Sequence, residues 1–403
     1  MIYQFNYLLA GGGCAGLAMA AQLHLRFGAQ AKILIVDRDD KNSNDRTWAF
    51  WSDQELPLGL DKIVRKEWSA VRFRSPSWER TTTIAPYQYR LINGIDYYRF
   101  MRAKLEAAPN VYFLKGEISH LGEDDKSPWA RVNNQLYRAE WIFDSRVGPE
   151  TRPAESSPHY FLWQHFYGWR VKMDKPHFAT QVATLMDFSH SHDGHPTFFY
   201  CLPFSPTEAL VEFTAFSNSL MDQEAYRKRM VEYLHQRFGP AKYIVTEEEQ
   251  GRIPMTDVDL ANRNYRRIRS IGTAGNAVKP TTGYAFLRIQ QQAESMAKQL
   301  FETGQVDQPP KLGGRFRWYD HLLLYLLQFE PQRSERIFSS LFEQQPFDRI
   351  LRFLDEDTAW WEEVMIFKDL PIGWFLEAAW KHQVRTSPIW SVGPTLTKGT
   401  QYG

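Results

Sequence analysis

Residues 3–37 read YQFNYLLAGGGCAGLAMAAQLHLRFGAQAKILIVD, and this stretch decides how the N-terminal part of the chain folds. Its opening apolar residues predict a strand, its glycines a turn, and the helical spacing of apolar residues from Cys14 to Phe27 a helix. A β-branched run then predicts a second strand that ends at Asp37. Two neighbouring strands joined in this way run parallel and need a right-handed crossover.

The glycines of this unit have the spacing Gly11-x-Gly13-x-x-Gly16 between the strand and the helix. The first glycine allows a tight turn, the second lets the backbone approach a pyrophosphate, and the third lets helix and strand pack closely. The helix N-terminus offers free N–H groups to the phosphates. Asp37, at the end of the second strand, is placed to accept hydrogen bonds from a ribose. The motif in this context predicts a dinucleotide site.

A second glycine element favours FAD over NAD. The segment Arg269-Ser-Ile-Gly-Thr-Ala-Gly275 is followed by Lys279-Pro-Thr-Thr-Gly-Tyr284 and by a predicted helix. A long dinucleotide needs a second place of close backbone approach for its flavin end, and Gly272, Gly275, Thr282 and Gly283 are candidates for it. The following helix would direct its N-terminus at the flavin, where a positive dipole end stabilises negative charge. The alternative is an ordinary turn between strand and helix.

The rest of the pattern predicts an α/β (mixed α+β) fold. We expect a Rossmann-like FAD-binding domain with an inserted antiparallel-sheet substrate domain and a helical C-terminal region. The expected division is residues 1–150 for the first part of the FAD domain (with an antiparallel insertion at about 65–92), 151–265 for the substrate domain, 266–305 for the returning part of the FAD domain, and 306–403 for the helical region.

The composition excludes several classes of protein. The 48 basic and 47 acidic side chains give a net charge of +1, without the basic surplus of a nucleic-acid binder. Cys14 and Cys201 are the only cysteines, which excludes a disulfide framework and a cysteine-based zinc site and fits a reducing cytoplasm. No apolar run approaches the roughly 18 residues of a membrane span. The chain nevertheless has 27 Phe, 19 Tyr and 14 Trp at a mean hydropathy of −0.48, an aromatic excess in a polar sequence.

With these motifs in place, nearly the whole chain resembles the bacterial lycopene cyclases, flavoproteins related in fold to the FAD-dependent hydroxylases. Beyond the glycine motifs, the specific matches are Arg46-Thr-Trp48, Leu185-Met-Asp-Phe188 and Leu210-Val-Glu-Phe-Thr214, in this order. Further matches are Pro86-Tyr-Gln-Tyr-Arg90, Gln164-His-Phe-Tyr-Gly168, Leu202-Pro-Phe-Ser205 and Ile253-Pro-Met255.

Two positions depart from the patterns of related enzymes. Flavin hydroxylases usually have Gly-Asp at the second glycine element, whereas this chain has Gly272-Thr273, which favours a cyclase. Many cyclases have a second acidic or polar residue beside the catalytic glutamate, where this chain has Phe213. A mechanism with two carboxylates therefore does not follow from this segment alone.

The resemblance implies a redox-neutral isomerase that turns lycopene into γ-carotene and then β-carotene. A proton adds to a terminal double bond, a cation forms, the ring closes and a proton leaves, in a site from which water is excluded. Glu212 is the candidate acid–base residue, since on a strand it would share one face with Leu210 and Thr214, and an apolar cavity would raise its pKa. Asp187 is the second catalytic candidate: it would position Glu212 or the flavin, or else cap the following turn.

Further expectations concern the cofactor and the surroundings. Arg46 and Thr47 are assigned to flavin or active-site contact. The flavin is expected in its reduced form, either stabilising the cation or passing the proton, with NADPH as a candidate reductant for which the sequence has no second dinucleotide motif. No metal is expected, because His190, His192 and His195 lie in a turn typical of a solvated loop. The apolar polyene substrate and the aromatic C-terminal segment favour a cytoplasmic protein held peripherally on the inner face of the cell membrane.

Two alternatives remain at this point. An FAD-dependent monooxygenase or another carotenoid-modifying oxidoreductase would consume oxygen or NADPH in step with product. A non-catalytic isoprenoid carrier would keep the glycine motifs but would not need Glu212.

Overall fold

The computed structural model describes residues 3–148, 152–154, 157–189, 194–261, 264–308 and 314–386, without the side chains of residues 383–386. The β-α-β unit predicted at the N-terminus is present as β1 (Tyr3–Ala10), α1 (Cys14–Phe27) and β2 (Ile33–Asp37). β1 and β2 pair in parallel, as the crossover through α1 requires.

A seven-stranded sheet is built on this unit, in the order β8-β2-β1-β11-β10-β9, with β17 paired to β11. Its remaining strands are β8 (Val111–Lys115), β9 (Ile118–Glu123), β10 (Pro128–Val132), β11 (Gln135–Asp144) and β17 (Ile268–Ser270). Alternate residues of the strands face opposite sides. Leu9 and Ile35 pack against α1, α2 (Gly94–Glu106) and α4 (Phe286–Thr303), whereas Leu8 belongs to a core shared with β9 and β10.

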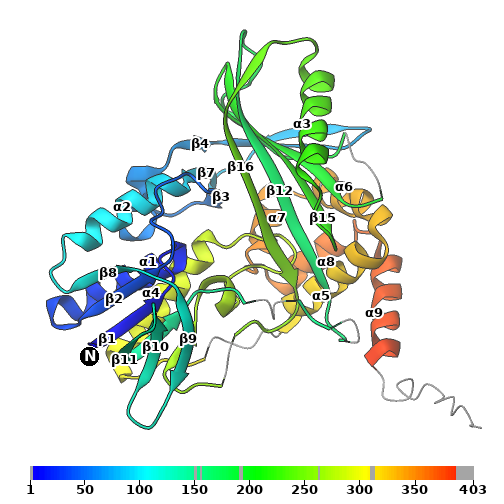
Figure 1. Ribbon diagram of the computed structural model, residues 1–403. Helices are drawn as coiled ribbons and strands as arrows, with labels where there is room; N and C mark the ends of the chain where they lie inside the picture. The colour runs from blue at the N-terminus through cyan, green and yellow to red at the C-terminus, as the bar shows by residue number, and fades with distance from the viewer. Residues whose placement is uncertain are drawn as a thin grey trace, which may run out of the picture.

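The second sheet has seven strands in the order β16-β12-β15-β14-β13-β5-β6. They are β12 (Phe161–Met173), β13 (Val182–Asp187), β14 (Thr197–Ser205), β15 (Glu208–Ser217), β16 (Tyr243–Thr256), β5 (Ala70–Arg74) and β6 (Glu79–Thr83). Figure 1 shows the long β12 and β16 running side by side across the molecule. This sheet is antiparallel as predicted, except that β13 and β5 pair in parallel.

The strands expected at 65–92 are divided between two sheets. β5 and β6 join the second sheet, whereas β4 (Lys66–Trp68) and β7 (Gln88–Asn93) form a small three-stranded sheet with β3 (Thr47–Ser52). The insertion is therefore not one separate antiparallel unit, because β5 completes its hydrogen bonds against β13, more than a hundred residues later in the chain.

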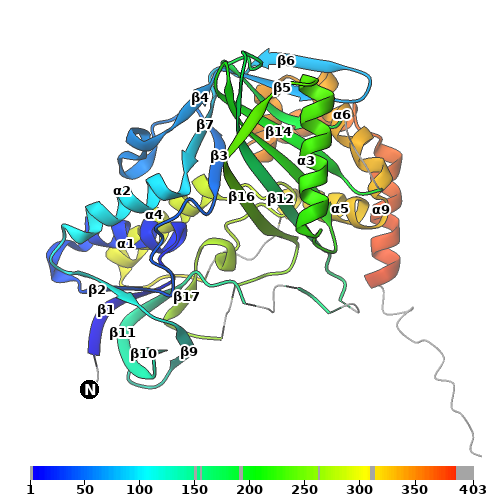
Figure 2. The same ribbon diagram turned by 45° about the horizontal axis from the view of Figure 1, so that its top comes forward.

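Helices cover both faces of the second sheet. On one face, α3 (Gln223–Phe238) packs its Tyr226, Met230 and Tyr233 on a core cluster with Phe199 and Phe213. The other face contacts the C-terminal helices, and Figure 2 shows α3 and these helices on opposite sides. They are α5 (Gly314–Phe329), α6 (Ser334–Gln344), α7 (Phe347–Leu354), α8 (Trp360–Phe367) and α9 (Ile372–Thr386).

The fold class predicted from the sequence is confirmed: a Rossmann-like part, a large second sheet and a helical C-terminal region. Short 3-10 helices lie at Gly28–Gln30, Pro57–Ile63, Pro331–Arg333 and, as η4, at Gly272–Gly275. Among the described residues, every helix is too short or too polar to cross a bilayer.

Candidate functional site

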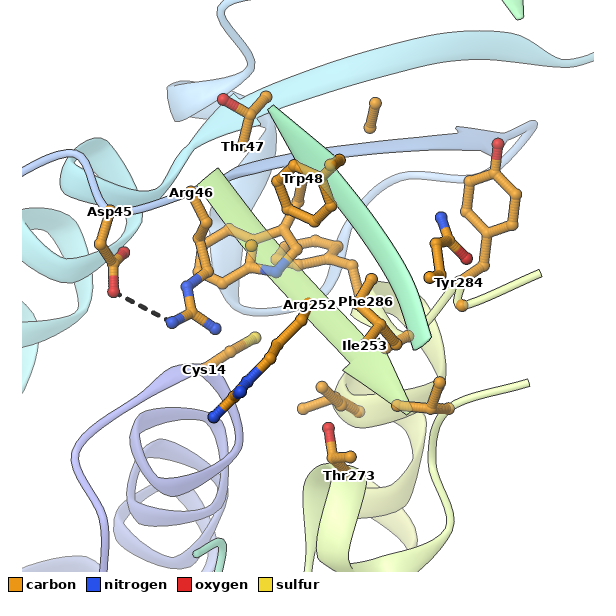
Figure 3. A pocket seen from close by; sticks show the side chains of 18 of the residues that line it. Cys14, Asp45, Arg46, Thr47, Trp48, Arg252, Ile253, Thr273, Tyr284 and Phe286 are labelled. Atoms are coloured by element: carbon orange, nitrogen blue, oxygen red, sulfur yellow. Dashed lines mark hydrogen bonds and ion pairs between the residues drawn. The ribbon is translucent and has the colours of Figure 1, made fainter. Parts of the chain in front are cut away.

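A cavity of about 370 Å³ lies where the Rossmann-like part meets the second sheet. Residues from α1, β3, β14, β15, β16, η4 and the start of α4 line it, and Figure 3 shows part of this lining. Most of the predicted site residues gather here. Those that line the cavity are Gly13, Arg46, Thr47, Glu212, Gly272, Thr282 and Gly283.

The cradle at the N-terminus of α1 fits a dinucleotide. Gly11 has φ +112°, a conformation that glycine adopts readily. A Cβ on Gly16 would collide with the carbonyl oxygen of Gly11, which explains the close approach of helix and strand. A Cβ on Gly13 would meet open space, and α1 has no acidic residue in its first turn. The helix N-terminus is thus open to a negatively charged group, as the sequence predicts.

Asp37 lies beside this cradle, next to a smaller pocket of about 160 Å³. Its Oδ2 accepts a hydrogen bond from the backbone N–H of Gly12 at 2.7 Å. The carboxylate thus fixes the glycine turn, and its place at the end of β2 is also where the sequence expects a ribose contact.

The second glycine element is held by the helix that follows it. Gln292 of α4 accepts a hydrogen bond from Gly272 N–H at 2.7 Å and donates one to the carbonyl of Gly275 at 2.7 Å. Gly275 packs behind the cavity, because its Cβ would lie 2.5 Å from the carbonyl oxygen of Ser270. Gly272 and the start of α4 face the cavity itself.

Arg46 and Thr47 reach the cavity from the start of β3. The Arg46 guanidinium lies 3.1 Å from the Asp45 carboxylate, which orients it, and Figure 3 shows this pair near Cys14 at the start of α1. Thr47 donates a hydrogen bond of 2.6 Å to Oε2 of Glu249. Thr47 therefore connects the cavity wall to a carboxyl that the sequence analysis did not single out.

Glu212 lies on β15, and its side chain lines the cavity together with that of Leu210. Thr214 donates a hydrogen bond to Glu212 Oε1 at 2.9 Å, so the face shared by these residues is the one expected from strand alternation. Tyr89, Tyr200 and Tyr284 line the same cavity, and burial raises the pKa of each phenol. The carboxyl thus lies among neutral aromatic side chains.

A second carboxyl converges on Glu212 from the opposite side of β12. In the strand register, Gly168 pairs with Glu212 of β15 and also with Glu249 of β16. A Cβ on Gly168 would lie 3.0 Å from Cγ and 3.4 Å from Oε1 of Glu249, so this side chain lies over the glycine. The missing side chain of Gly168 leaves room for the two carboxyls to approach each other.

The surroundings of this carboxyl pair favour a bound proton. Burial raises the pKa of Glu212 well above its usual range, and the nearby Glu249 raises it further. Burial also raises the pKa of Glu249, against the opposing effect of the hydrogen bond from Thr47. Oε1 of Glu249 is buried and accepts no hydrogen bond from any described residue. A proton shared between the two carboxyls would supply one.

Asp187 lies on the opposite face of the second sheet. In the strand register Asp187 pairs with Phe199, whereas Glu212 pairs with Tyr200. Phe199 and Tyr200 are neighbours on β14 and point to opposite faces, so their partners do as well. Asp187 is fully buried and accepts hydrogen bonds from Arg74 at 2.8 Å and Tyr233 at 3.1 Å. It also accepts one from the backbone N–H of Ser189 at 3.0 Å, the turn-capping role that the sequence left open.

Sequence reasoning missed Glu249. It stands in an acidic run, Glu247-Glu248-Glu249, which is typical of a solvated strand edge. The signal that could have found it is the segment Ile253-Pro-Met255 just beyond it, which matches the cyclase pattern on the same strand. For the metal expectation, His190 and His192 lie outside the described residues. Within the described ones, no three His, Cys, Asp or Glu are grouped so as to hold a metal ion.

Known proteins with similar sequences include lycopene beta-cyclases. The chain is 23% identical to the lycopene beta-cyclase of Pantoea ananas over 287 residues, which cover 70% of this chain and 71% of that protein. It is 24% identical to the chloroplastic lycopene beta cyclase of an Oncidium hybrid cultivar over 295 residues, or 70% of this chain and 60% of that protein.

Solved structures with a similar fold are more distant in sequence. A geranylgeranyl bacteriochlorophyll reductase-like protein from Thermoplasma acidophilum superposes with a TM-score of 0.59 at 12% identity, covering 94% of this chain and 99% of that one. A variant of the halogenase PltM in complex with FAD gives a TM-score of 0.54 at 12% identity, covering 88% and 82%. These likenesses establish the Rossmann-like fold of FAD-binding proteins. The family model described as "Lycopene cyclase protein" matches residues 7–379, and the chain therefore belongs to the lycopene cyclase family.

Proposed function

We propose that this protein is a lycopene β-cyclase, which closes β-ionone rings on the ends of lycopene to give γ-carotene and then β-carotene. The observation that carries the proposal is Glu212 on the wall of the cavity that also contains the dinucleotide cradle, with Glu249 facing it across Gly168. A protonated carboxyl among aromatic side chains is what proton addition to a carbon–carbon double bond requires.

FAD is the proposed cofactor. Gly11, Gly13 and Gly16 with the N-terminus of α1 would hold its pyrophosphate, and Asp37 its ribose. Gly272, Thr282 and Gly283 with the start of α4 would border the flavin end. When bound and reduced, with NADPH as the proposed source of electrons, the flavin supplies negative charge close to the cation.

Glu212 is the proposed proton donor. Its O–H bond breaks as a C–H bond forms at the terminal double bond of the polyene, which leaves a tertiary cation. The ring carbon–carbon bond then forms, and a proton lost from the neighbouring carbon returns to the Glu212 carboxylate. Atoms and electrons balance, and the reaction is a redox-neutral isomerisation.

The surrounding residues have supporting roles in this proposal. Thr214 orients Oε1 of Glu212, and Glu249, fixed by Thr47, keeps the proton on the pair. Tyr89 and Tyr200 provide π-faces against the cation and help to exclude water, which would trap it. Trp48 continues this aromatic wall and contacts the ring of Phe286.

The proposal includes a place at the membrane. Trp360, Trp361 and Val364 of α8 are exposed, an unusual concentration of apolar side chains for a water-facing helix. Tryptophan and aliphatic residues of this kind suit the boundary between headgroups and acyl chains. The polyene is dissolved in the bilayer, so we place the protein on the cytoplasmic surface of the membrane. Flotation with liposomes tests this, and the variant Trp360→Glu/Trp361→Glu should remain unbound.

The test of the reaction is expression in a bacterium that accumulates lycopene, followed by chromatography of the pigments. Cyclic carotenes are expected. Purified protein with chemically reduced FAD should then convert lycopene without oxygen and without further electron input. Consumption of NADPH or oxygen in step with product would refute the cyclase and favour a monooxygenase or another oxidoreductase. Binding of lycopene without any conversion would favour the carrier.

A further inference from the structure

A second cavity, of about 300 Å³, lies among the C-terminal helices, and we call it the helical chamber. Side chains of α5, α6, α7 and α9 form most of its wall, including Leu322, Leu341, Phe353, Phe375 and Ala379. The few charged groups of the wall are paired with one another. Lys279 lies 2.9 Å from Asp320, which also accepts a hydrogen bond of 2.6 Å from Thr281. The chamber therefore suits a ligand without polar groups.

The helical chamber adjoins the cavity of Glu212. Thr282 lines both of them, Lys279 and Thr281 line the chamber, and Gly283 and Tyr284 line the catalytic cavity. The loop 279–284 is thus the partition between the two, held on the chamber side by the Lys279–Asp320 ion pair. A long ligand that passes Thr282 can occupy both cavities at once.

The chamber also reaches the surface of the protein. Ile372 and Leu376 of α9 line the chamber and are nevertheless 44% and 65% exposed. Trp318 of α5 lines it too and is likewise exposed. At these three residues the apolar wall of the chamber reaches the surface of the C-terminal helices, and we call this opening at Leu376 the mouth.

We infer that the helical chamber binds the far part of the polyene chain while the end that cyclises lies beside Glu212. The inference rests on the proposed function for the identity of the ligand. The chemistry that selects it is apolar: a linear hydrocarbon buries its whole length against the chamber wall and leaves no polar group unpaired. The mouth at Leu376 is the route by which such a chain leaves the membrane.

The test measures hydrocarbon binding apart from catalysis. Diphenylhexatriene, a fluorescent linear polyene, is titrated into the FAD-loaded full chain in detergent-free buffer and then displaced with lycopene. Leu376→Lys places a charge in the mouth, and Trp380→Lys is its matched control. Trp380 lies one helical turn further along α9 and is equally exposed, at 65%, but does not line the chamber.

We expect Leu376→Lys to weaken diphenylhexatriene binding and to raise the KM for lycopene by about tenfold, as a charge in an apolar site should. Trp380→Lys should leave both unchanged. Ala379→Trp, which fills the chamber from its wall, should act like Leu376→Lys. Because Leu376 is exposed, its substitution is expected to leave the thermal melting curve unchanged even where Ala379→Trp disturbs folding.

Equal diphenylhexatriene binding in the wild type and Leu376→Lys would overturn the inference. So would displacement by oleate but not by lycopene, which would make the chamber an acyl-chain site. Lycopene that displaces the probe without being cyclised would leave the chamber standing and remove the proposed reaction. Ring formation with an unchanged KM in both Leu376→Lys and Ala379→Trp would leave the proposed reaction standing and would remove the chamber as the binding site of the polyene.

Discussion

Replacing Gly168 by alanine places a methyl group between the carboxyls of Glu212 and Glu249. Gly168 pairs with both residues in the sheet register, and its backbone is ordinary extended strand, so alanine introduces no backbone strain. The substitution changes no ionisable group. Its effect on ring formation therefore reports the approach of the two carboxyls to each other.

The size of the effect follows from the contacts of the new Cβ. It would lie 3.0 Å from Cγ of Glu249 and 3.3 Å from Cδ1 of Leu210. Carbon atoms in contact ordinarily lie about 3.5–4.0 Å apart, so Glu249 must retreat by roughly 0.5–1 Å. A misplacement of about 1 Å can cost about 100-fold in rate, and we expect ring formation to slow by about 10- to 100-fold.

The pH dependence should change less than the rate. At a separation of about 5 Å and an effective dielectric constant of about 20, two carboxylates repel by about 3 kcal/mol. Moving them about 1 Å further apart removes about 0.5 kcal/mol, or about 0.4 pKa unit at Glu212. The alkaline limb of the pH–rate profile should move to lower pH by only this amount.

The assay is anaerobic single-turnover cyclisation of lycopene by protein loaded with reduced FAD, from pH 5 to 9. The variant Glu249→Asp draws the second carboxyl back by one methylene group with Gly168 unchanged, and it should slow ring formation as Gly168→Ala does. Thermal melting serves as the control for folding. A full rate in Gly168→Ala at an unchanged melting temperature would refute the idea that the two carboxyls work as a pair.

Three further substitutions test the same site from other sides. Glu249→Gln removes the whole repulsion, so the pKa of Glu212 should fall and the alkaline limb should move to lower pH by about two units; an unmoved limb would remove Glu249 from the mechanism. Glu212→Gln should abolish ring formation but keep the visible absorbance of bound flavin. The fold raises the pKa of Glu212, so at any pH above the usual glutamate pKa the folded state binds more protons than the unfolded state. The free energy of unfolding therefore falls as the pH rises from the usual glutamate pKa to the raised one. Glu212→Gln should therefore be more stable at pH 8 in urea unfolding, by about 1.4 kcal/mol for each unit by which the pKa is raised. Asp187→Asn breaks the buried pair with Arg74 and should cost about 3 kcal/mol of unfolding free energy while ring formation persists, whereas lost activity at unchanged stability would reinstate a catalytic role.

Local patterns in the sequence predicted the local structure well. The glycine spacing with its flanking strands defines the β-α-β unit, and the helix expected after Tyr284 is observed as α4. The hairpin of β9 and β10 was not assigned in advance, and the division of the strands at 65–92 between two sheets was not foreseen. Strand partners are chosen by tertiary packing, and the parallel pairing of β5 with β13 leaves no trace in the sequence around either strand.

The sequence likewise predicted the parts of the candidate site that depend on local patterns. Gly13, Arg46 and Thr47 lie close to the first glycine motif, and their common cavity follows from the Rossmann-like topology. The face of Glu212 also followed from strand alternation. The side of the sheet on which Asp187 would lie did not, because that depends on the register of β13 against β14, which shifts irregularly between Thr184 and Asp187.

The register of β12 explains why the second carboxyl could not be found beside the first. Phe213, the neighbour of Glu212 in the chain, points to the α3 face and packs against Phe199, so it could not supply an acid to the cavity. The acid comes instead from β16, across the backbone of Gly168. A slip of one residue between β12 and β16 would turn Glu249 to the opposite face and separate the pair. In the proposed site the two carboxyls come from β15 and β16 with β12 between them, and only the pairing of these three strands brings them together.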